Sequence, residues 1–292
     1  MGNAPSSSGL YQEYDVSNVA KVKDILKTVN ISVLDSIKNE LLGFDLVVVV
    51  DNSAAMKDDW QHAHNTLLDL FTLAGSYDPD GFDLCVVRGS GLGHVDGCTP
   101  WKLEAGMWGL RGVMPDRVHR VSEHLKRLTF SDNSSSLYHT LDELLKAYRA
   151  DIERWHVWKR RKLNCIVLTS HCRQATEMEE LIQKTAKWTR EHRLPDNQVG
   201  FQFVQLGDDM KTSAFMGHLD EKLKYTHSDM DIVDRTHLKN PDESTLVKIL
   251  LGGVLRREDI ERVLGQSDSL AFQVLHGMVQ KLKPKRRQTM YY

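Results

Sequence analysis

The sequence has few cysteines, no strong excess of charge of either sign and no long apolar run. Its four cysteines, Cys85, Cys98, Cys165 and Cys172, form no Cys-x-x-Cys pair, so we expect no structural zinc site. The 38 basic and 40 acidic side chains give a formal charge of −2, which argues against nucleic-acid binding, since nucleic-acid-binding proteins usually carry a basic excess. The longest apolar run, Leu46–Val50, is far too short to span a bilayer.

The first twenty residues lack the apolar core of a secretory signal peptide. We therefore expect a cytoplasmic protein whose thiols stay reduced. Of the 292 residues, 41% are hydrophobic and 27% are charged, which is ordinary globular usage. This composition excludes a fully disordered chain, a collagen-like chain and a disulfide miniprotein.

Apolar patterns predict alternating strands and helices between residues 43 and 264. The segment Leu46–Val50 is a continuous β-branched run, typical of a strand buried on both faces. Further strands are expected at 83–87, 163–169, 198–206 and 231–233, and helices at 56–74, 118–128, 137–155, 176–192, 213–223 and 244–264. This alternation predicts an α/β fold with a doubly wound, mostly parallel sheet and helices on both faces. The Gly-rich segment 89–112 is left unassigned.

Both ends of the chain lie outside this alternating pattern. Residues 1–14 are rich in Ser, Gly and Asn and are expected to form a flexible arm. Residues 15–42 are expected to form a helical extension. Residues 265–292 are expected to form an amphipathic helix and a basic tail, whose charges are Lys281, Lys283, Lys285, Arg286 and Arg287.

Several segments, taken in order, resemble the von Willebrand factor type A domain. The strand and loop Phe44–Met56 resemble the opening of that domain. The later segments that carry the resemblance are Trp60, Tyr77–Leu84, Leu141 with Leu145 and Tyr148, Gln198–Gly207, Asp231–Asp234 and Ile249–Val254. Over roughly residues 43–264, the chain resembles in particular the single-domain type A proteins of fungi. The resemblance implies a Rossmann-like fold and a protein-binding role.

The resemblance also implies a metal-ion-dependent adhesion site that has lost ligands. In the family, the first loop carries Asp-x-Ser-x-Ser, a second loop supplies a hydroxyl and a third supplies an aspartate. This chain has Asp51, Ser53 and Ala55 in the first loop, Ser135 in the second and Ser170 in the third. A hard divalent cation would thus meet a single carboxylate. We expect no resident cofactor and, at most, weak binding of Mg²⁺ or Mn²⁺.

Asp51 has a second interpretation, in which it only caps the helix that follows the first strand. A carboxylate suits a helix N-terminus, where it accepts hydrogen bonds from unpaired amides. Four other carboxylates, Asp78, Asp80, Asp208 and Asp209, are candidates to complete a metal site. Their spacing along the chain does not place them near Asp51, so both interpretations stay open.

No motif points to catalysis. The segment Gly89–Gly93 follows a strand, but its Gly-x-Gly-x-Gly spacing differs from the dinucleotide-binding pattern. Ser90 is not a nucleophile elbow, because Arg88 occupies the first glycine position. We therefore expect a non-catalytic module that binds an unidentified protein partner. The alternatives are Mg²⁺-dependent binding of an acidic partner and an unrecognised hydrolase.

The segment Met1–Ser6 fits the pattern for N-myristoylation of Gly2. One myristoyl chain binds a membrane only marginally, so stable anchoring needs a second signal. The basic tail offers that signal, because cationic side chains are attracted to anionic leaflets. The sequence thus raises the hypothesis of a membrane-associated protein. The alternative is a C-terminal helix packed on the domain and a solvated tail.

Overall fold

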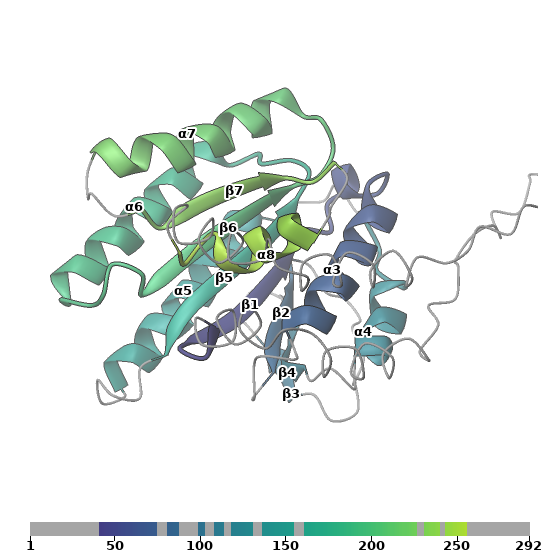
Figure 1. Ribbon diagram of the computed structural model, residues 1–292, viewed down its shortest axis with the longest axis horizontal. Helices are drawn as coiled ribbons and strands as arrows, with labels where there is room; N and C mark the ends of the chain where they lie inside the picture. Colours follow the sequence, from purple (N-terminus) through teal and green to yellow (C-terminus); the bar gives the residue numbers. More distant parts are fainter. Residues whose placement is uncertain are drawn as a thin grey trace, which may run out of the picture.

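The computed structural model describes residues 41–74, 81–87, 99–102, 108–113, 118–130, 136–154, 161–226, 231–239 and 243–255. In these ranges a central sheet lies between two layers of helices (Figure 1). The expected N-terminal arm, the C-terminal helix and the basic tail lie outside the described residues, as does nearly all of the expected N-terminal helical extension.

Seven strands form the sheet, in the order β3-β4-β2-β1-β5-β6-β7. Five of them pair in parallel: β1 (Phe44–Val50), β2 (Phe82–Val86), β5 (Lys162–Thr169), β6 (Val199–Gln205) and β7 (Val233–His237). This arrangement confirms the doubly wound, mostly parallel sheet. Chain order runs in opposite directions on the two sides of β1, and such a switch point leaves a crevice at the carboxyl ends of the strands.

The other two strands form a hairpin that the sequence did not predict. Strands β3 (Thr99–Lys102) and β4 (Trp108–Val113) pair antiparallel with each other, and β4 pairs antiparallel with β2. Both strands are short, and Pro100 and Gly109 interrupt any regular apolar alternation. Proline is tolerated here because β3 is the edge strand of the described sheet.

Helices cover both faces of the sheet, as predicted (Figure 1). One layer contains α3 (Trp60–Ala74), α4 (Val118–Leu125) and α8 (Glu243–Leu251), and the other contains α5 (Leu137–Arg154), α6 (Ala175–Glu191) and α7 (Met210–Thr226). Alternate residues of β1 pack against the two helical layers. Val48 and Val50 pack in the first layer, whereas Val47 and Val49 pack in the second, so the unbroken valine run is buried on both faces.

Two element boundaries differ from the sequence prediction. Residues Ala54–Met56 form a short 3₁₀ turn, η1, and the α-helix begins only at Trp60 rather than at Met56. The last described strand is Val233–His237 rather than 231–233. Strand β7 lies at the edge of the sheet and is only partly buried, so most of its side chains are polar or charged. It therefore lacks the apolar run by which the other parallel strands were predicted.

Strand β6 and the end of α8 approach each other so closely that neither tolerates a side chain at the contact. A Cβ added to Gly200 would lie 1.8 Å from the carbonyl oxygen of Gly253. Glycine is therefore required for this close approach. None of the described helices is long and apolar enough to cross a membrane.

Candidate functional site

The Asp51 carboxylate lies at the carboxyl end of β1 and is 4% exposed. Its Oδ2 accepts hydrogen bonds from the Thr169 hydroxyl at 2.7 Å and from the Ser53 hydroxyl at 3.0 Å. Its Oδ1 accepts a bond from the backbone N–H of Ser53 at 2.9 Å. The carboxylate therefore closes the turn after β1 and ties it to the end of β5. It does not cap α3, which begins nine residues later, at Trp60.

Burial raises the pKa of Asp51 above its ordinary value of 3.8. The hydrogen bonds from Thr169 and Ser53 oppose this rise, because they stabilise the charged form. His171 also lowers the pKa through its charge, as the smallest of these effects. Burial therefore disfavours the charged form of the Asp51 carboxyl, whereas the hydrogen bonds from Thr169 and Ser53 favour it.

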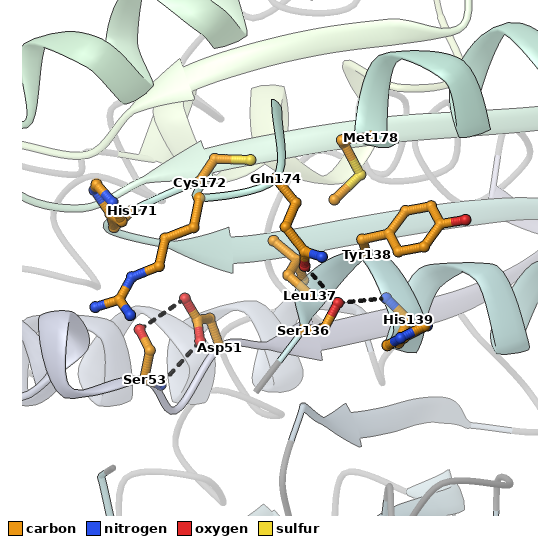
Figure 2. Close-up of a pocket in the computed structure, with 11 residues that line it drawn as sticks. Asp51, Ser53, Ser136, Leu137, Tyr138, His139, His171, Cys172, Gln174 and Met178 are labelled. Atoms are coloured by element: carbon orange, nitrogen blue, oxygen red, sulfur yellow. Dashed lines mark hydrogen bonds between the residues drawn. The ribbon is translucent and has the colours of Figure 1, made fainter. Parts of the chain in front are cut away.

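A pocket of about 340 Å³ opens beside Asp51 (Figure 2). Three segments line it: Asp51 with Ser53 after β1, residues 136–139 at the start of α5, and residues 171–174 with Met178 at the start of α6. The pocket thus lies at the carboxyl ends of β1 and β5, where the topology predicts a crevice.

Ser136, the residue directly before α5, lines one wall of the pocket (Figure 2). Its hydroxyl oxygen accepts a hydrogen bond from the backbone N–H of His139 at 3.0 Å, which makes Ser136 the N-cap of that helix. The same hydroxyl donates to the side-chain oxygen of Gln174 at the start of α6. Ser136 therefore joins the two helices across the pocket.

The loop after β5 forms the opposite wall and is held by α7. His171 Nδ1 lies 3.2 Å from Asp209 Oδ2, and the backbone N–H of Thr212 donates to the same oxygen at 2.8 Å. Thr212 accepts in turn from the Cys172 backbone N–H at 2.9 Å. The hydrogen bonds from Thr212, together with His171, hold the pKa of Asp209 below its ordinary value. The Asp209 carboxylate thus accepts a hydrogen bond from the first turn of α7.

The described lining residues offer few ligands of the kind that a divalent cation prefers. Asp51 is the one carboxylate among the lining residues that the structure describes, and Arg173 places a positive charge in the same lining. Burial raises the pKa of the Cys172 thiol to about 11 and thus favours the neutral thiol over the thiolate. Within the described ranges, no three His, Cys, Asp or Glu side chains are grouped so that they could hold a metal ion. Mg²⁺ prefers several hard oxygens, and the described lining supplies one carboxylate, that of Asp51.

The structure brings some of the predicted site residues together. Asp51 and Ser53 line the pocket, Ala55 is exposed in η1, and Ser170 is buried at the end of β5. Ser135 lies outside the described residues, as do Asp78, Asp80, Gly2 and the five basic tail residues. Neither Asp208 nor Asp209 lines the pocket.

Sequence reasoning missed most of the lining residues, among them Ser136, Arg173 and Gln174. Ser136 had a usable signal, since a serine directly before an apolar helical stripe is a common N-cap. Arg173 and Gln174 had none, because they reach the pocket only through the pairing of β5 beside β1.

No protein-family model matches the chain, and a search of the curated proteins finds no match either. The pilus adhesin SpaC from Lactobacillus rhamnosus GG, in its open conformation, is similar in structure, with a TM-score of 0.40 and 11% identity over 77% of this chain and 30% of that chain. Two structures of proximal thread matrix protein 1 from the mussel byssus have TM-scores of 0.39. They share 13% and 12% identity over 73% and 72% of this chain, and 47% and 46% of theirs. In the second, zinc occupies the MIDAS motif.

The chain spans less than half the length of each of these proteins. The sheet order and the pairing of its strands define a Rossmann-like α/β protein. The function proposed below is inferred from the geometry of the pocket.

Proposed function

We propose that this protein is a non-catalytic, protein-binding or scaffolding module of the von Willebrand factor type A kind, with a degenerate metal site. One observation carries the proposal. The Asp51 carboxylate accepts three hydrogen bonds from Thr169 and Ser53, so its two oxygens are used within the fold. Ser170 stands where the family would supply a second carboxylate.

The polar groups of the pocket also support a non-catalytic role. The Ser53 hydroxyl donates to a carboxylate and the Ser136 hydroxyl to an amide oxygen, and neither is hydrogen-bonded to an imidazole in the described structure. His171 faces Asp209 of the neighbouring helix. The Cys172 thiol is protonated at neutral pH, since its pKa is about 11. The base that activates a serine nucleophile is usually a histidine, and the Asp51 carboxylate that accepts from Ser53 also accepts a structural hydrogen bond from Thr169.

Affinity capture from the source organism tests this proposal. The full-length chain is used as bait in buffers that contain either EDTA or Mg²⁺, and bound proteins are identified by mass spectrometry. The proposal expects the same specific partner in both buffers. A screen of ester, phosphoester and peptide substrates is run in parallel, and turnover that Ser53→Ala abolishes would establish an enzyme instead.

The second candidate is Mg²⁺-dependent binding of an acidic partner. It is favoured by the position of Asp51, Ser53 and Ser136, whose side-chain oxygens line one pocket. A cation there would draw part of its coordination shell from the partner. Capture that appears in Mg²⁺ and disappears in EDTA would select this candidate over the first.

A further inference from the structure

The exposed cations of helix α6 are of two kinds, which differ in their partners. Its lysines, Lys184 and Lys187, lie 3.6 Å and 3.8 Å from a carboxylate oxygen of a glutamate four residues away. Arg190 lies in the last turn of the helix and Arg193 just beyond its end, and both are exposed. Neither arginine side chain has a hydrogen bond or an ion pair within the described ranges. The fold therefore pairs the lysines and leaves the arginines to solvent.

Arg193 has a backbone conformation that favours glycine. Its φ is +53°, and no other non-glycine residue in the part of the chain that the structure describes has a positive φ. The backbone N–H of Leu194 donates to the Thr189 carbonyl at 3.0 Å, and that of Arg193 donates to the Arg190 carbonyl at 2.9 Å. These two bonds form a Schellman ending, in which glycine is the usual residue at the position of Arg193. An arginine is thus kept where a side chain strains the backbone.

The end of the helix itself gives these arginines no structural role. Cations near a helix C-terminus often donate to the last carbonyls. His192 supplies that contact here, because its Nδ1 lies 2.9 Å from the Trp188 carbonyl oxygen. Its ring also packs on the Trp188 indole, with 4.9 Å between the ring centroids. The side chains of Arg190 and Arg193 make no such bond in the described structure.

The end of α5 lies beside the end of α6 and adds a third arginine. Glu153 Oε1 lies 4.0 Å from His192 Nε2, which brings the two helix ends together. Arg154, the last residue of α5, is exposed and also has no side-chain partner among the described residues. Both helices begin at the pocket and end at the other end of the sheet (Figure 1). We call Arg154, Arg190 and Arg193 the arginine patch.

We infer that the arginine patch is a docking surface for an acidic segment of a partner protein, separate from the pocket. A guanidinium group presents a planar fork of N–H donors that matches a carboxylate. Glu153 and the exposed Asp196 flank the patch and lower its net charge. A membrane surface responds to net charge, whereas a peptide can place one carboxylate opposite each arginine. The inference rests on the proposed role as a protein-binding module and specifies the chemistry of its partner.

The test uses the full-length protein in EDTA and a fluorescently labelled peptide of four glutamates with blocked ends. Fluorescence anisotropy measures binding, and the same peptide with glutamine at each position is the uncharged comparison. We expect saturable binding of the glutamate peptide that weakens as salt is added, and no saturable binding of the glutamine peptide. Sedimentation with phosphatidylserine vesicles is measured in parallel for the unmodified protein and the variants.

The double variant Arg190→Gln with Arg193→Gln should weaken peptide binding by about tenfold or more, because charge-assisted hydrogen bonds are lost. Arg193→Gly alone should also weaken binding, yet it should melt at the same or a higher temperature, since glycine adopts a positive φ without strain. That combination separates a docking role from a structural one. Arg127→Gln is the matched control, because Arg127 is an exposed arginine that follows α4 in the opposite helical layer. It should bind as the unmodified protein does.

Four results would overturn the inference. They are no preference for the glutamate peptide, equal weakening by Arg127→Gln and the double variant, unchanged binding by Arg193→Gly, and a lower melting temperature of Arg193→Gly. If the double variant loses vesicle binding and the unmodified protein binds no peptide, the patch is a membrane surface instead.

Affinity capture in EDTA judges the proposed function separately. If the double variant captures the same partner as well as the unmodified protein does, the module binds through another surface. In that case the proposed function stands and the inference about the arginine patch is wrong. If the peptide binds through the patch but capture yields no partner, the proposed function fails and the patch remains a site for acidic peptides.

Discussion

The hydroxyl of Thr169 donates to Asp51 Oδ2 over 2.7 Å and joins two residues that are 118 positions apart in the chain. The contact follows from the parallel pairing of β1 and β5, in which Val50 lies opposite Leu168. The backbone N–H of Asp51 also donates to the Leu168 carbonyl at 2.9 Å. Asp51 therefore links two central strands at the floor of the site, which is a structural role.

The first prediction concerns the stability of this link. Asp51→Ala should lower the free energy of unfolding by about 1–3 kcal/mol, because it removes hydrogen bonds to a charged, buried group. The effect is limited, since removing the carboxylate also relieves its cost of burial. Urea denaturation measures the change, with Ser53→Ala as a milder comparison at about 1 kcal/mol. If Asp51→Ala is as stable as the unmodified protein, Asp51 does not stabilise the fold by linking β1 to β5.

The second prediction concerns pH and the packing of α3 against α4. His64 is 5% exposed, and its Nε2 lies 3.1 Å from the Ser122 hydroxyl oxygen. Burial lowers the pKa of His64 below its ordinary value of 6.5, while Lys126 lowers it further and Glu123 opposes this. The unfolded chain therefore takes up a proton before the folded one does. Stability from neutral His64 is present above about pH 6.5 and is lost as the pH falls towards the lowered pKa.

Urea midpoints at about pH 7.5 and about pH 5.5 test this, since histidine titrates in this range. His64→Gln should lose less stability on acidification than the unmodified protein does. His119→Gln, which changes an exposed histidine of α4, should keep the original pH dependence. If His64→Gln loses as much stability on acidification as His119→Gln does, or more, then protonation of His64 does not weaken the α3–α4 contact.

The third prediction concerns the close approach of β6 and α8. Gly200→Ala should destabilise the fold by about 1–3 kcal/mol through overpacking, because its Cβ would meet the Gly253 carbonyl oxygen at 1.8 Å. Gly43→Ala is the control, since nothing lies within 4 Å of its added Cβ. We expect Gly43→Ala to stay within about 0.5 kcal/mol of the unmodified protein in urea denaturation. Equal effects of the two substitutions would mean that α8 is not packed on β6 as described.

The fourth prediction concerns membranes and carries forward the hypothesis drawn from the chain ends. A myristoylated Gly2 and the basic tail should together hold part of the protein on anionic membranes. Cell fractionation compares the unmodified protein with Gly2→Ala and with a form truncated after Leu282. Membrane association should be lost in both variants. Recovery of the unmodified protein wholly in the soluble fraction, with an unmodified Gly2 by mass spectrometry, would end the hypothesis.

The sequence predicted the sheet and both helical layers because their signals are local. The valine run of β1 and the apolar stripes of α5 and α6 each occupy one short stretch of chain. The hairpin of β3 and β4 was missed because both strands are short and because Pro100 and Gly109 interrupt any regular apolar alternation. Asp51 was correctly placed at a strand end, but its partner Thr169 depends on strand pairing across 118 residues. No local pattern encodes that contact or the arrival of Arg173 in the pocket.

The fifth prediction is a restoration of the metal site. Ala55→Ser with Ser170→Asp returns a hydroxyl and a second carboxylate to the positions that the family resemblance assigns. Without a cation, the new carboxylate beside Asp51 should destabilise the fold through like-charge repulsion. Mg²⁺ should therefore raise the melting temperature of this variant. Ala55→Ser with Ser170→Asn, which matches the shape but adds no charge, should not respond.

Calorimetric titration of Mg²⁺ and Mn²⁺ into the unmodified, metal-free protein tests the central claim most directly. The account predicts no saturable heat at millimolar cation, because one buried carboxylate with its oxygens already hydrogen-bonded is a poor site for a dication. The double variant Ala55→Ser with Ser170→Asp, titrated in the same way, should give a saturable isotherm. Tight binding by the unmodified protein, abolished by Asp51→Ala, would contradict the account and establish a working metal-dependent adhesion site.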